Sequence, residues 1–388
     1  MNTPFCIILC LAAALLAQAP NVEFHKLFNS SSVPAKTGDQ ADIYAHYVVE
    51  TADHGFALAV RCCCSHCGND FSLIKTDSAG NLVWSNRYDG PNGDDNPNCV
   101  QQTNDGGFII AGQTNDQNAL QDAFVVKTNS AGDQVWSNTY GNTGGYVWEQ
   151  PYHIIQTTDG GFCFAGYVWD RNNSTGLDAY VVKLNAQGNA VWTKTYGGAR
   201  EDWLRCVQQT ADGGYILCGT TGSVTTGFGY DVWLVRLNGS GDTLWTRHFG
   251  GEDVNDGGMF LEITQDNGYI ITGYANNYED MYLVRTNSEG VLQWEKTYGA
   301  DDTTSECSHA VKEIPGEGYI MGGYTAYNKP EPCIVRTDLQ GNVLWRKTVP
   351  SGTWDYFYSI ALTSDGGIVA TGRQDQRTYA QLIKLDGR

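Results

Sequence analysis

The ten residues TADGGYILCG (210–219) recur, with substitutions, along the whole chain. The Asp-Gly pair at their centre has the backbone freedom that a tight hairpin turn needs, and apolar runs on either side suit the two strands of the hairpin. The other copies are TADHGFALAV (51–60), TNDGGFIIAG (103–112), TTDGGFCFAG (157–166), TQDNGYIITG (264–273), IPGEGYIMGG (314–323) and TSDGGIVATG (363–372). Seven copies predict seven hairpins of one kind.

The distance between the copies indicates the architecture. Their second glycines lie 49 to 54 residues apart, and a tryptophan follows each of the first six copies. One unit contains four strand-like runs, which are RCVQQT (205–210), YILCGT (215–220), DVWLVRLN (231–238) and TLWTRHF (243–249). A period near fifty residues with four strands per unit predicts a β-propeller.

The two ends of the chain predict how the ring closes. The last copy is followed by one further strand, in AQLIKLDGR (380–388), whereas VEFHKLF (22–28) resembles a fourth strand with Phe24 at the tryptophan position. We therefore expect an all-β fold, a seven-bladed β-propeller with four antiparallel strands per blade. The N-terminal strand should complete the last blade. No change of composition divides residues 20–388, which we expect to form a single domain.

The composition restricts the partners. Of the 388 residues 41% are hydrophobic and 17% are charged, as in a globular protein, and the formal net charge is −19. A strongly negative protein repels nucleic acid and anionic membrane surfaces. We expect neither of them as a partner.

The first 19 residues have the features of an export signal. They are apolar, too short to span a bilayer and end in small residues. We expect a cleaved signal peptide, a secreted, extracellular or periplasmic protein without a transmembrane segment, and a monomer. Four Asn-X-Ser/Thr sequons are candidate glycosylation sites, at Asn29, Asn172, Asn173 and Asn238.

The cysteines suggest disulfides in an oxidising compartment. The stretch RCCCSHCGND (61–70) is the most irregular in the chain, and its candidates are Cys62, Cys63, Cys64 and Cys67, with Cys99 of the next repeat as a further partner. Zinc ligation by these cysteines and His66 is the alternative. Cys206 and Cys218 are equidistant from Asp212, so they should face each other across one hairpin. A disulfide and two buried thiols both remain open there.

The repeat unit resembles a known kind of propeller. The segment DAYVVKLNAQGNAVWTKTYGG (178–198), following a DGG hairpin, is similar to repeats of secreted propellers related to the PQQ-like and BamB-like tryptophan-repeat proteins. The resemblance covers nearly all of the chain after the signal. It implies the fold and says little about activity, because propellers host many functions.

A carboxylate recurs eight residues before the start of six of the seven copies, and Ile43 takes that position before the first copy. The set is Asp95, Glu149, Asp202, Asp256, Glu306 and Asp355. In one interpretation each carboxylate accepts hydrogen bonds from backbone N–H groups in its own interblade turn. In the other, the ring forms a channel mouth that binds a ligand or a cation such as Ca²⁺, although it is wide for a single ion. No other cofactor is expected.

Charged residues also recur on the third strand of each unit. Acids stand at Asp70, Asp122, Asp178, Asp231, Asp280 and Glu331, and bases five residues later at Lys75, Lys127, Lys183, Arg236, Arg285, Arg336 and Lys384. We expect a structural role, with pairing between neighbouring blades.

Aromatic residues that break the repeat are better candidates for function, because blade architecture does not require them. They are Tyr146, Trp148, Trp203, Trp354, Tyr356 and Tyr358, near the carboxylate ring. Aromatic side chains beside carboxylates suit sugars or a partner's side chains. The alternative is that these rings seal the channel or the blade contacts.

Motifs of known catalytic sites are absent from the sequence. It has no G-x-S-x-G, H-E-x-x-H or phosphate-binding loop. We expect a non-catalytic binding module for a glycan or an extracellular protein. A structural extracellular or cell-envelope protein is one alternative. An enzyme is another, either a quinoprotein-like one or a hydrolase or lyase with His46 and His153 as acid–base groups.

Overall fold

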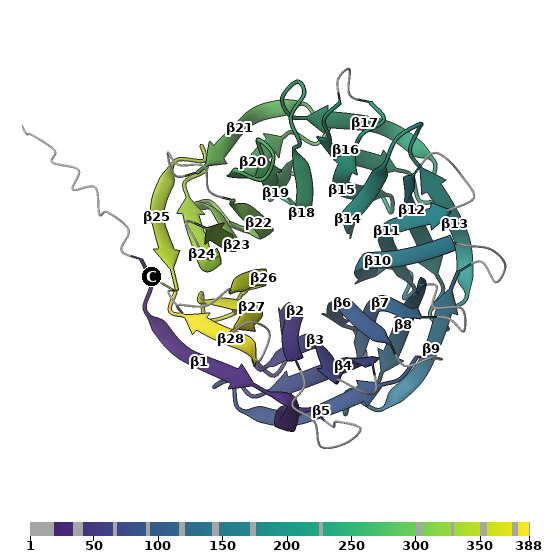
Figure 1. The fold of residues 1–388 in the computed structure, drawn as a ribbon, viewed down its shortest axis with the longest axis vertical. Coiled ribbons are helices and arrows are strands. Elements are labelled where there is room, and N and C mark those ends of the chain that lie inside the picture. Colours follow the sequence, from purple (N-terminus) through teal and green to yellow (C-terminus); the bar gives the residue numbers. More distant parts are fainter. Residues whose placement is uncertain are drawn as a thin grey trace, which may run out of the picture.

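The structure, a computed structural model, describes residues 19–33, 42–64, 68–90, 94–115, 121–141, 147–170, 176–224, 228–299, 305–326, 330–349, 355–374 and 379–387. Within these ranges, 28 strands form seven four-stranded antiparallel sheets, arranged as blades around a central axis (Figure 1). The expected seven-bladed β-propeller is confirmed. No helix of the described residues is long and apolar enough to cross a membrane.

Each blade runs from an innermost to an outermost strand. Blade 1 contains β2 (Asp42–Glu50), β3 (Phe56–Cys64), β4 (Gly68–Thr76) and β5 (Leu82–Tyr88). Blade 2 contains β6 (Asp95–Gln102), β7 (Phe108–Asn115), β8 (Gln121–Thr128) and β9 (Gln134–Tyr140). Blade 3 contains β10 (Val147–Gln156), β11 (Phe162–Asp170), β12 (Leu177–Leu184) and β13 (Ala190–Tyr196). Blade 4 contains β14 (Asp202–Gln209), β15 (Tyr215–Thr221), β16 (Asp231–Leu237) and β17 (Thr243–Phe249).

The remaining three blades follow the same plan. Blade 5 contains β18 (Gly257–Ile263), β19 (Tyr269–Ala275), β20 (Asp280–Thr286) and β21 (Leu292–Tyr298). Blade 6 contains β22 (Cys307–Ile314), β23 (Gly318–Ala326), β24 (Pro330–Thr337) and β25 (Val343–Thr348). Blade 7 contains β26 (Tyr356–Leu362), β27 (Ile368–Gln374), β28 (Tyr379–Leu385) and β1 (Val22–Phe28), and η1 (Ser30–Ser32) follows β1.

The N-terminal strand closes the ring as predicted. β1 pairs antiparallel with β28, from Phe24 opposite Lys384 to Phe28 opposite Ala380 (Figure 1). Phe24 then packs on Phe56 of blade 1, with ring centroids 6.1 Å apart. Tryptophans make the corresponding contact at other junctions, such as Trp84 with Phe108 at 5.8 Å. At the junction of blades 7 and 1, Phe24 thus makes the aromatic contact that a tryptophan makes at other junctions.

The hydrogen bonds around Asp159 explain why the Thr-x-Asp-Gly-Gly turn recurs. Its carboxylate accepts from Thr157 Oγ1 at 2.6 Å, from the Gly161 backbone N–H at 3.0 Å and from Lys183 Nζ at 2.9 Å. Gly160 has φ of 79°, which favours glycine, and a Cβ on Gly161 would lie 2.2 Å from the Leu184 carbonyl oxygen. One carboxylate therefore ties the hairpin to the third strand.

The basic residues of the third strands pair within their own blade, so the expectation of pairing between blades was wrong for them. The pairs are Lys75–Asp53, Lys127–Asp105, Lys183–Asp159, Arg236–Asp212, Arg285–Asp266, Arg336–Glu317 and Lys384–Asp365. The turn acid is the nearer partner because the hairpin folds back over the end of the third strand.

Candidate ligand-binding site in the central channel

Every innermost strand contains a β-bulge at the same repeat position. In blade 1, Ala45 pairs with Val60 and Tyr47 pairs with Ala59, so His46 is the extra residue. The seven extra residues are His46, Asn98, Tyr152, Arg205, Met259, His309 and Tyr358. A bulge interrupts the alternation of a strand and redirects a side chain. Here it directs one additional side chain per blade toward the axis.

All seven bulge residues line one cavity in the channel. Its volume is about 440 Å³, and Tyr47, Gln150, His153 and Phe260 complete the described lining. This volume is within the range of small-ligand pockets, roughly 300–1,000 Å³. The cavity is the feature to which every blade contributes, and we take it as the candidate functional site.

Three rings form the floor of this cavity. Tyr47 Oη and His153 Nε2 are 3.1 Å apart, and the Phe260 ring lies edge-on to His153 at 5.4 Å between centroids. The same three residues also line a cavity of about 830 Å³ on the side of the DGG turns. They therefore separate the two ends of the channel.

An arc of aromatic side chains borders the cavity over blades 1, 7 and 6. His46 stacks on Tyr358 at 5.5 Å, and Tyr358 contacts His309 at 5.4 Å. Tyr356 stacks parallel to Tyr358 at 5.9 Å and meets Tyr324 edge-on at 4.6 Å. These rings form a continuous surface of the kind that packs against flat ligands.

Three guanidinium groups lie over aromatic rings near the cavity. They are Arg205 over Tyr152 at 3.7 Å, Arg373 over Tyr356 at 4.2 Å and Arg61 over Tyr44 at 5.3 Å. The Nε atom of each arginine is buried and has no hydrogen-bond partner among the described residues. Three cationic side chains thus lie near this cavity in a chain of net charge −19.

The two histidines of the arc are neutral at neutral pH. Burial, together with the charges of Arg61 and Arg373, lowers the pKa of His46 to about 3. Burial lowers the pKa of His309 to about 4, and Arg205 adds to this effect. Both imidazoles therefore act as neutral hydrogen-bonding groups rather than as cations.

The carboxylates of the first ring lie in the interior of the interblade turns. Asp95, Asp202 and Asp256 are buried and accept from the backbone N–H groups of Gly90 at 2.9 Å, Gly198 at 2.9 Å and Gly251 at 2.7 Å. Burial raises the pKa of Asp95 and Asp256. These contacts are those of the turn-capping interpretation.

The other three carboxylates are buried as well. Glu306 accepts two hydrogen bonds from Arg346 Nη2, at 2.9 and 2.8 Å, and one from Thr325 Oγ1 at 2.6 Å. Glu149 and Asp355 are at most 2% exposed. None of the six belongs to the described lining of the channel cavity. Within the described ranges no cluster of three or more His, Cys, Asp or Glu residues is suited to a metal, and Ca²⁺ binding stays a prediction.

The structure brings only part of the aromatic set to the cavity. Trp148 contacts Trp169 edge-on at 5.1 Å, and Trp203 packs on Tyr230 at 5.4 Å, so both contact rings of their own blades. Tyr356 and Tyr358 belong to the aromatic arc. Tyr146 and Trp354 lie outside the described residues.

The cysteines differ from the disulfide expectation. Cys99, Cys206 and Cys218 are free thiols and, like Cys62, they are buried. They pack as small apolar side chains between blades: Cys99 Sγ is 3.7 Å from the Ile154 carbonyl oxygen, and Cys206 Sγ is 3.6 Å from that of Leu261. Cys206 does lie opposite Cys218, as predicted. Cys67 and the side chains of Cys63 and Cys64 are outside the described part of the chain.

Two of the four sequons lie on described turns. Asn29 caps η1 by accepting from the Ser31 backbone N–H at 3.0 Å. Asn238 accepts from the Ser240 N–H at 2.9 Å in a turn between β16 and β17. Asn172 and Asn173 are outside the described residues. Glycosylation stays a prediction at all four.

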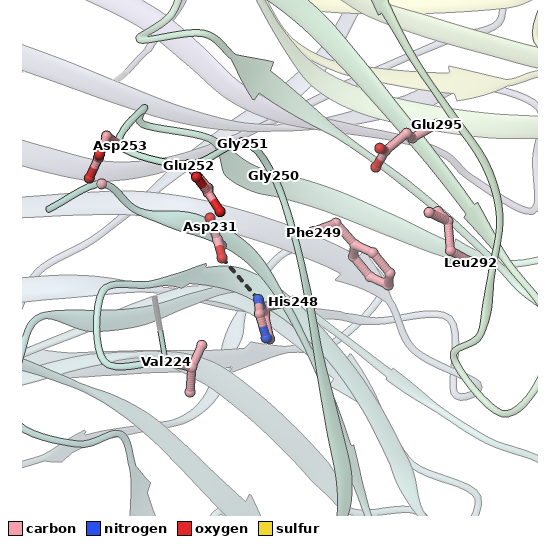
Figure 2. Close-up of a pocket in the computed structure, with 11 residues that line it drawn as sticks. Val224, Asp231, His248, Phe249, Gly250, Gly251, Glu252, Asp253, Leu292 and Glu295 are labelled. Carbon is pink, nitrogen blue, oxygen red and sulfur yellow. Dashed lines mark hydrogen bonds and ion pairs between the residues drawn. The ribbon is translucent and has the colours of Figure 1, made fainter. Parts of the chain in front are cut away.

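A separate cavity of about 350 Å³ lies between blades 4 and 5. Figure 2 shows His248 and Asp231 pointing toward one another on its wall, and His248 Nδ1 is 2.9 Å from Asp231 Oδ2. Leu292 and Glu295 of blade 5 line its other side (Figure 2). The described residues that line this cavity come from two blades, whereas those that line the channel cavity come from all seven.

The sequence predicted His46, His153 and Tyr358, of which His46 and Tyr358 are bulge residues, but the other five bulge residues were missed. A signal for them exists in the sequence. The residue five positions before the start of each copy is His, Asn, Tyr, Arg, Met, His or Tyr, although the flanking pattern repeats. A position that varies inside a regular repeat indicates a role other than forming the blade.

Comparisons with known proteins show the fold. No family model and no curated protein matches this chain. It is similar to a puromycin hydrolase S511A mutant complexed with PGG, with a TM-score of 0.55 and 10% identity over 90% of this chain and 52% of that one. It is also similar to the WD40 domain of Toxoplasma gondii coronin (TM-score 0.53, 8% identity, 96% and 89% covered) and to the Penicillium chrysogenum alpha-L-arabinanase complexed with arabinobiose (0.52, 11%, 95% and 99%). The family resemblance of the repeats stays a prediction.

Proposed function

We propose that this chain is an exported, non-catalytic carbohydrate-binding module whose site is the channel cavity. The observation that carries the proposal is the set of seven bulges, which bring one side chain from each blade into a single cavity of about 440 Å³. The positions that repeat from blade to blade are sufficient to form the propeller. The seven side chains at the bulge position, which are of five residue types, are available for recognition.

The aromatic arc supports a sugar as ligand. The rings of Tyr358 and Tyr356 are parallel within 4°, and His46 lies nearly parallel to Tyr358 at 20°. Apolar faces of sugar rings pack on such surfaces, while a few convergent polar groups bind the hydroxyls. Asn98, Gln150 and the imidazoles supply polar groups of this kind.

The shape of the site favours a small ligand over a protein surface. A stable protein interface buries roughly 1,200–2,000 Å² and is commonly broad. The channel site is instead a cavity enclosed by seven strands, with a floor made by Tyr47, His153 and Phe260. A partner protein would have to insert a single side chain or loop.

The chemistry of the lining supports binding rather than glycoside hydrolysis. Most glycosidases use two carboxyl groups on either side of the scissile bond. The described residues that line the cavity include no Asp or Glu. The imidazole of His153 is present on the floor, but it is hydrogen-bonded to Tyr47 and contacts the Val207 carbonyl oxygen at 3.1 Å.

A glycan array, followed by calorimetric titration of the hits with and without Ca²⁺, tests the proposal. The wild-type protein should bind at least one glycan saturably. Tyr358→Ala should weaken that binding roughly 10-fold or more, because stacking on an aromatic ring is lost. Trp203→Ala is the matched control, since Trp203 lies outside the cavity lining.

Other outcomes would contradict the channel cavity as the binding site. Loss of binding in Trp203→Ala with retention in Tyr358→Ala would place the ligand on the interblade loops. No glycan binding by any preparation would contradict the proposal. Release of new reducing ends from a bound glycan would show an enzyme instead of a binding module.

A further inference from the structure

We propose that the channel cavity selects an acidic sugar, and that the Arg205 guanidinium binds its carboxylate or sulfate group. This inference rests on the proposed function and names the ligand class for the same site. It is carried by one unpaired cation, by a lining without described acids and by two fixed hydrogen-bond acceptors.

Arg205 differs from the structural cations of the propeller. The bases of the third strands each pair with a turn acid, as Arg236 does with Asp212 at 2.6 Å. No ion pair joins Arg205 to any described carboxylate, and its Nε is buried without a hydrogen-bond partner there. A partly buried guanidinium with unused donors is costly, and an anionic ligand offsets that cost.

The position of Arg205 is fixed before a ligand arrives. It is the bulge residue of blade 4, and its Cζ atom lies 3.7 Å from the centroid of the Tyr152 ring, the bulge residue of blade 3. Tyr152 in turn contacts Tyr167 at 5.8 Å. Stacking immobilises the planar guanidinium and leaves its edge free to bind two oxygens of an anion.

The surroundings reinforce the positive charge. The cavity lining contains no described Asp or Glu, and Arg61 and Arg373 lie close enough to His46 to lower its pKa. His46 Nε2 is also buried without a partner in the described structure. An anion on Arg205 therefore meets no described acid in the cavity.

Two neighbouring groups are arranged for hydroxyls. The Phe357 carbonyl oxygen lies 3.0 Å from His309 Nδ1, so the neutral imidazole donates there and leaves Nε2 as an acceptor. Asn98 Nδ2 donates to the Pro151 carbonyl oxygen at 2.7 Å, which leaves Asn98 Oδ1 as an acceptor. Acceptors of this kind bind the hydroxyl donors of a sugar. A ligand with hydroxyls and an anionic group satisfies the whole set.

The test is calorimetric titration with three matched probes at low salt. They are galacturonate oligosaccharides, their methyl-esterified forms and sulfated oligosaccharides. Wild-type protein should bind at least one of the two acidic probes at least 10-fold more tightly than the esterified one. Which acidic probe binds distinguishes a carboxylate from a sulfate group. Added NaCl should weaken binding of the acidic probe.

Variants of Arg205 test whether this residue causes the preference for the acidic probe. Arg205→Gln should weaken binding of the acidic probe roughly 10- to 100-fold, as expected for loss of a charge-assisted hydrogen bond. Arg205→Lys should lie between, because it keeps the charge and loses the planar fork. Arg247→Gln is the control, since Arg247 also lies over an aromatic ring, Trp245 at 5.0 Å, but on the outermost strand β17. Circular dichroism confirms that each variant is folded.

Two failures have different meanings. If the esterified or neutral probes bind as tightly as the acidic ones, or if Arg205→Gln binds like wild type, the acidic ligand is wrong while carbohydrate binding stands. If no probe and no arrayed glycan binds, the proposed function itself fails.

Discussion

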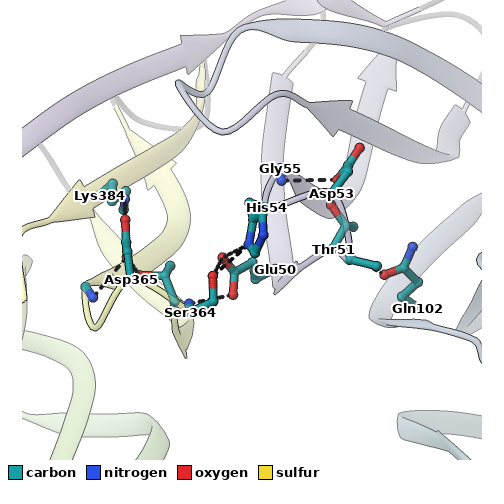
Figure 3. Close-up of polar contacts among 12 residues, drawn as sticks. Glu50, Thr51, Asp53, His54, Gly55, Gln102, Ser364, Asp365 and Lys384 are labelled. Atoms are coloured by element: carbon teal, nitrogen blue, oxygen red, sulfur yellow. Dashed lines mark hydrogen bonds and ion pairs between the residues drawn. The ribbon is translucent and has the colours of Figure 1, made fainter.

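Glu50 accepts two hydrogen bonds from Ser364 across the junction where the ring closes. Its carboxylate lies 2.8 Å from the Ser364 backbone nitrogen and 2.8 Å from the Ser364 hydroxyl (Figure 3). His54 Nδ1 lies 2.7 Å from the same hydroxyl. At other junctions a glutamine at this repeat position makes the backbone contact, as Gln102 Oε1 does with the Ala52 N–H at 2.8 Å. In blades 1 to 4 the residue before the opening Thr thus links successive blades.

Glu50→Ala should destabilise the propeller by about 1–2 kcal/mol, because it removes two hydrogen bonds at the closing junction. Glu50→Gln should retain most of the stability, since glutamine makes this contact between blades 1 and 2. Urea denaturation followed by tryptophan fluorescence measures both. Equal stability of the alanine variant and the wild type would show that the Glu50–Ser364 hydrogen bonds do not stabilise the closing junction.

Lys183→Met should cost about 1–3 kcal/mol, because Lys183 is buried and donates to both Asp159 and the Leu184 carbonyl oxygen. Lys194→Met is the control, since the Lys194–Asp242 pair is exposed and such pairs contribute little. The same denaturation assay compares them. Similar losses in the two variants would contradict the role of the buried network.

The stability of the protein between pH 4 and pH 2 should depend on the aspartates of the hairpin turns. Burial alone would raise the pKa of Asp159, but hydrogen bonds from Thr157, Lys183 and Gly161 outweigh it and lower that pKa to about 2. A depressed carboxyl pKa contributes stability above the unfolded pKa near 4, which is lost as pH falls toward 2. Lys183→Met should therefore lose less stability than wild type between pH 4 and pH 2, measured by thermal melts.

The histidines of the aromatic arc should make the protein less stable below pH 6.5. The pKa of His309 is about 4 in the folded state, so the unfolded chain binds a proton that the folded chain does not. Stability is complete above the unfolded pKa near 6.5 and falls as the pH decreases toward 4. At pH 5 this one group should cost roughly 1–2 kcal/mol. His309→Gln should flatten the pH dependence of unfolding between pH 7.5 and pH 5; an unchanged slope would contradict burial of the neutral imidazole.

Met259→Trp should block the channel cavity while leaving the blades intact. Met259 is a half-buried bulge residue that lines the cavity, so a larger side chain projects into open space. Glycan binding should fall at least 10-fold, and the free energy of unfolding should change by about 1 kcal/mol or less. Val135→Trp, on the outer strand β9 where Val135 is 61% exposed, controls for the added ring. Retained binding in Met259→Trp would place the ligand elsewhere.

Local turn chemistry accounts for what could be predicted of the fold. Asp-Gly at a fixed distance from Thr specifies a hairpin without reference to the rest of the chain, and Phe24 at the tryptophan position predicts the strand that closes the ring. The pairing of Lys183 could not be predicted in the same way. Whether it meets Asp159 of its own hairpin or an acid of the next blade depends on how far the hairpin folds over the sheet.

The candidate site was predicted only in part for a related reason. Tyr356 and Tyr358 were identified as aromatic residues that break the repeat, whereas Arg205 lies at the same repeat position as Tyr358 but is not aromatic and was not predicted. The carboxylates of the first ring were predicted as ligand-binding groups because they recur at one repeat position. In the structure they lie inside the interblade turns. At Asp95, Asp202 and Asp256 the recurring carboxylate binds backbone N–H groups of its own interblade turn.

The amino-acid sequence by itself determined the number of blades, their strand order and the closing strand, because hairpin turns and strand periodicity are local properties. Only the tertiary structure decided which side chains meet in the channel. His46 and Arg205 are far apart in the chain, and each is turned inward by a bulge that depends on strand register. Closure of seven sheets around one axis then brings them to the same cavity.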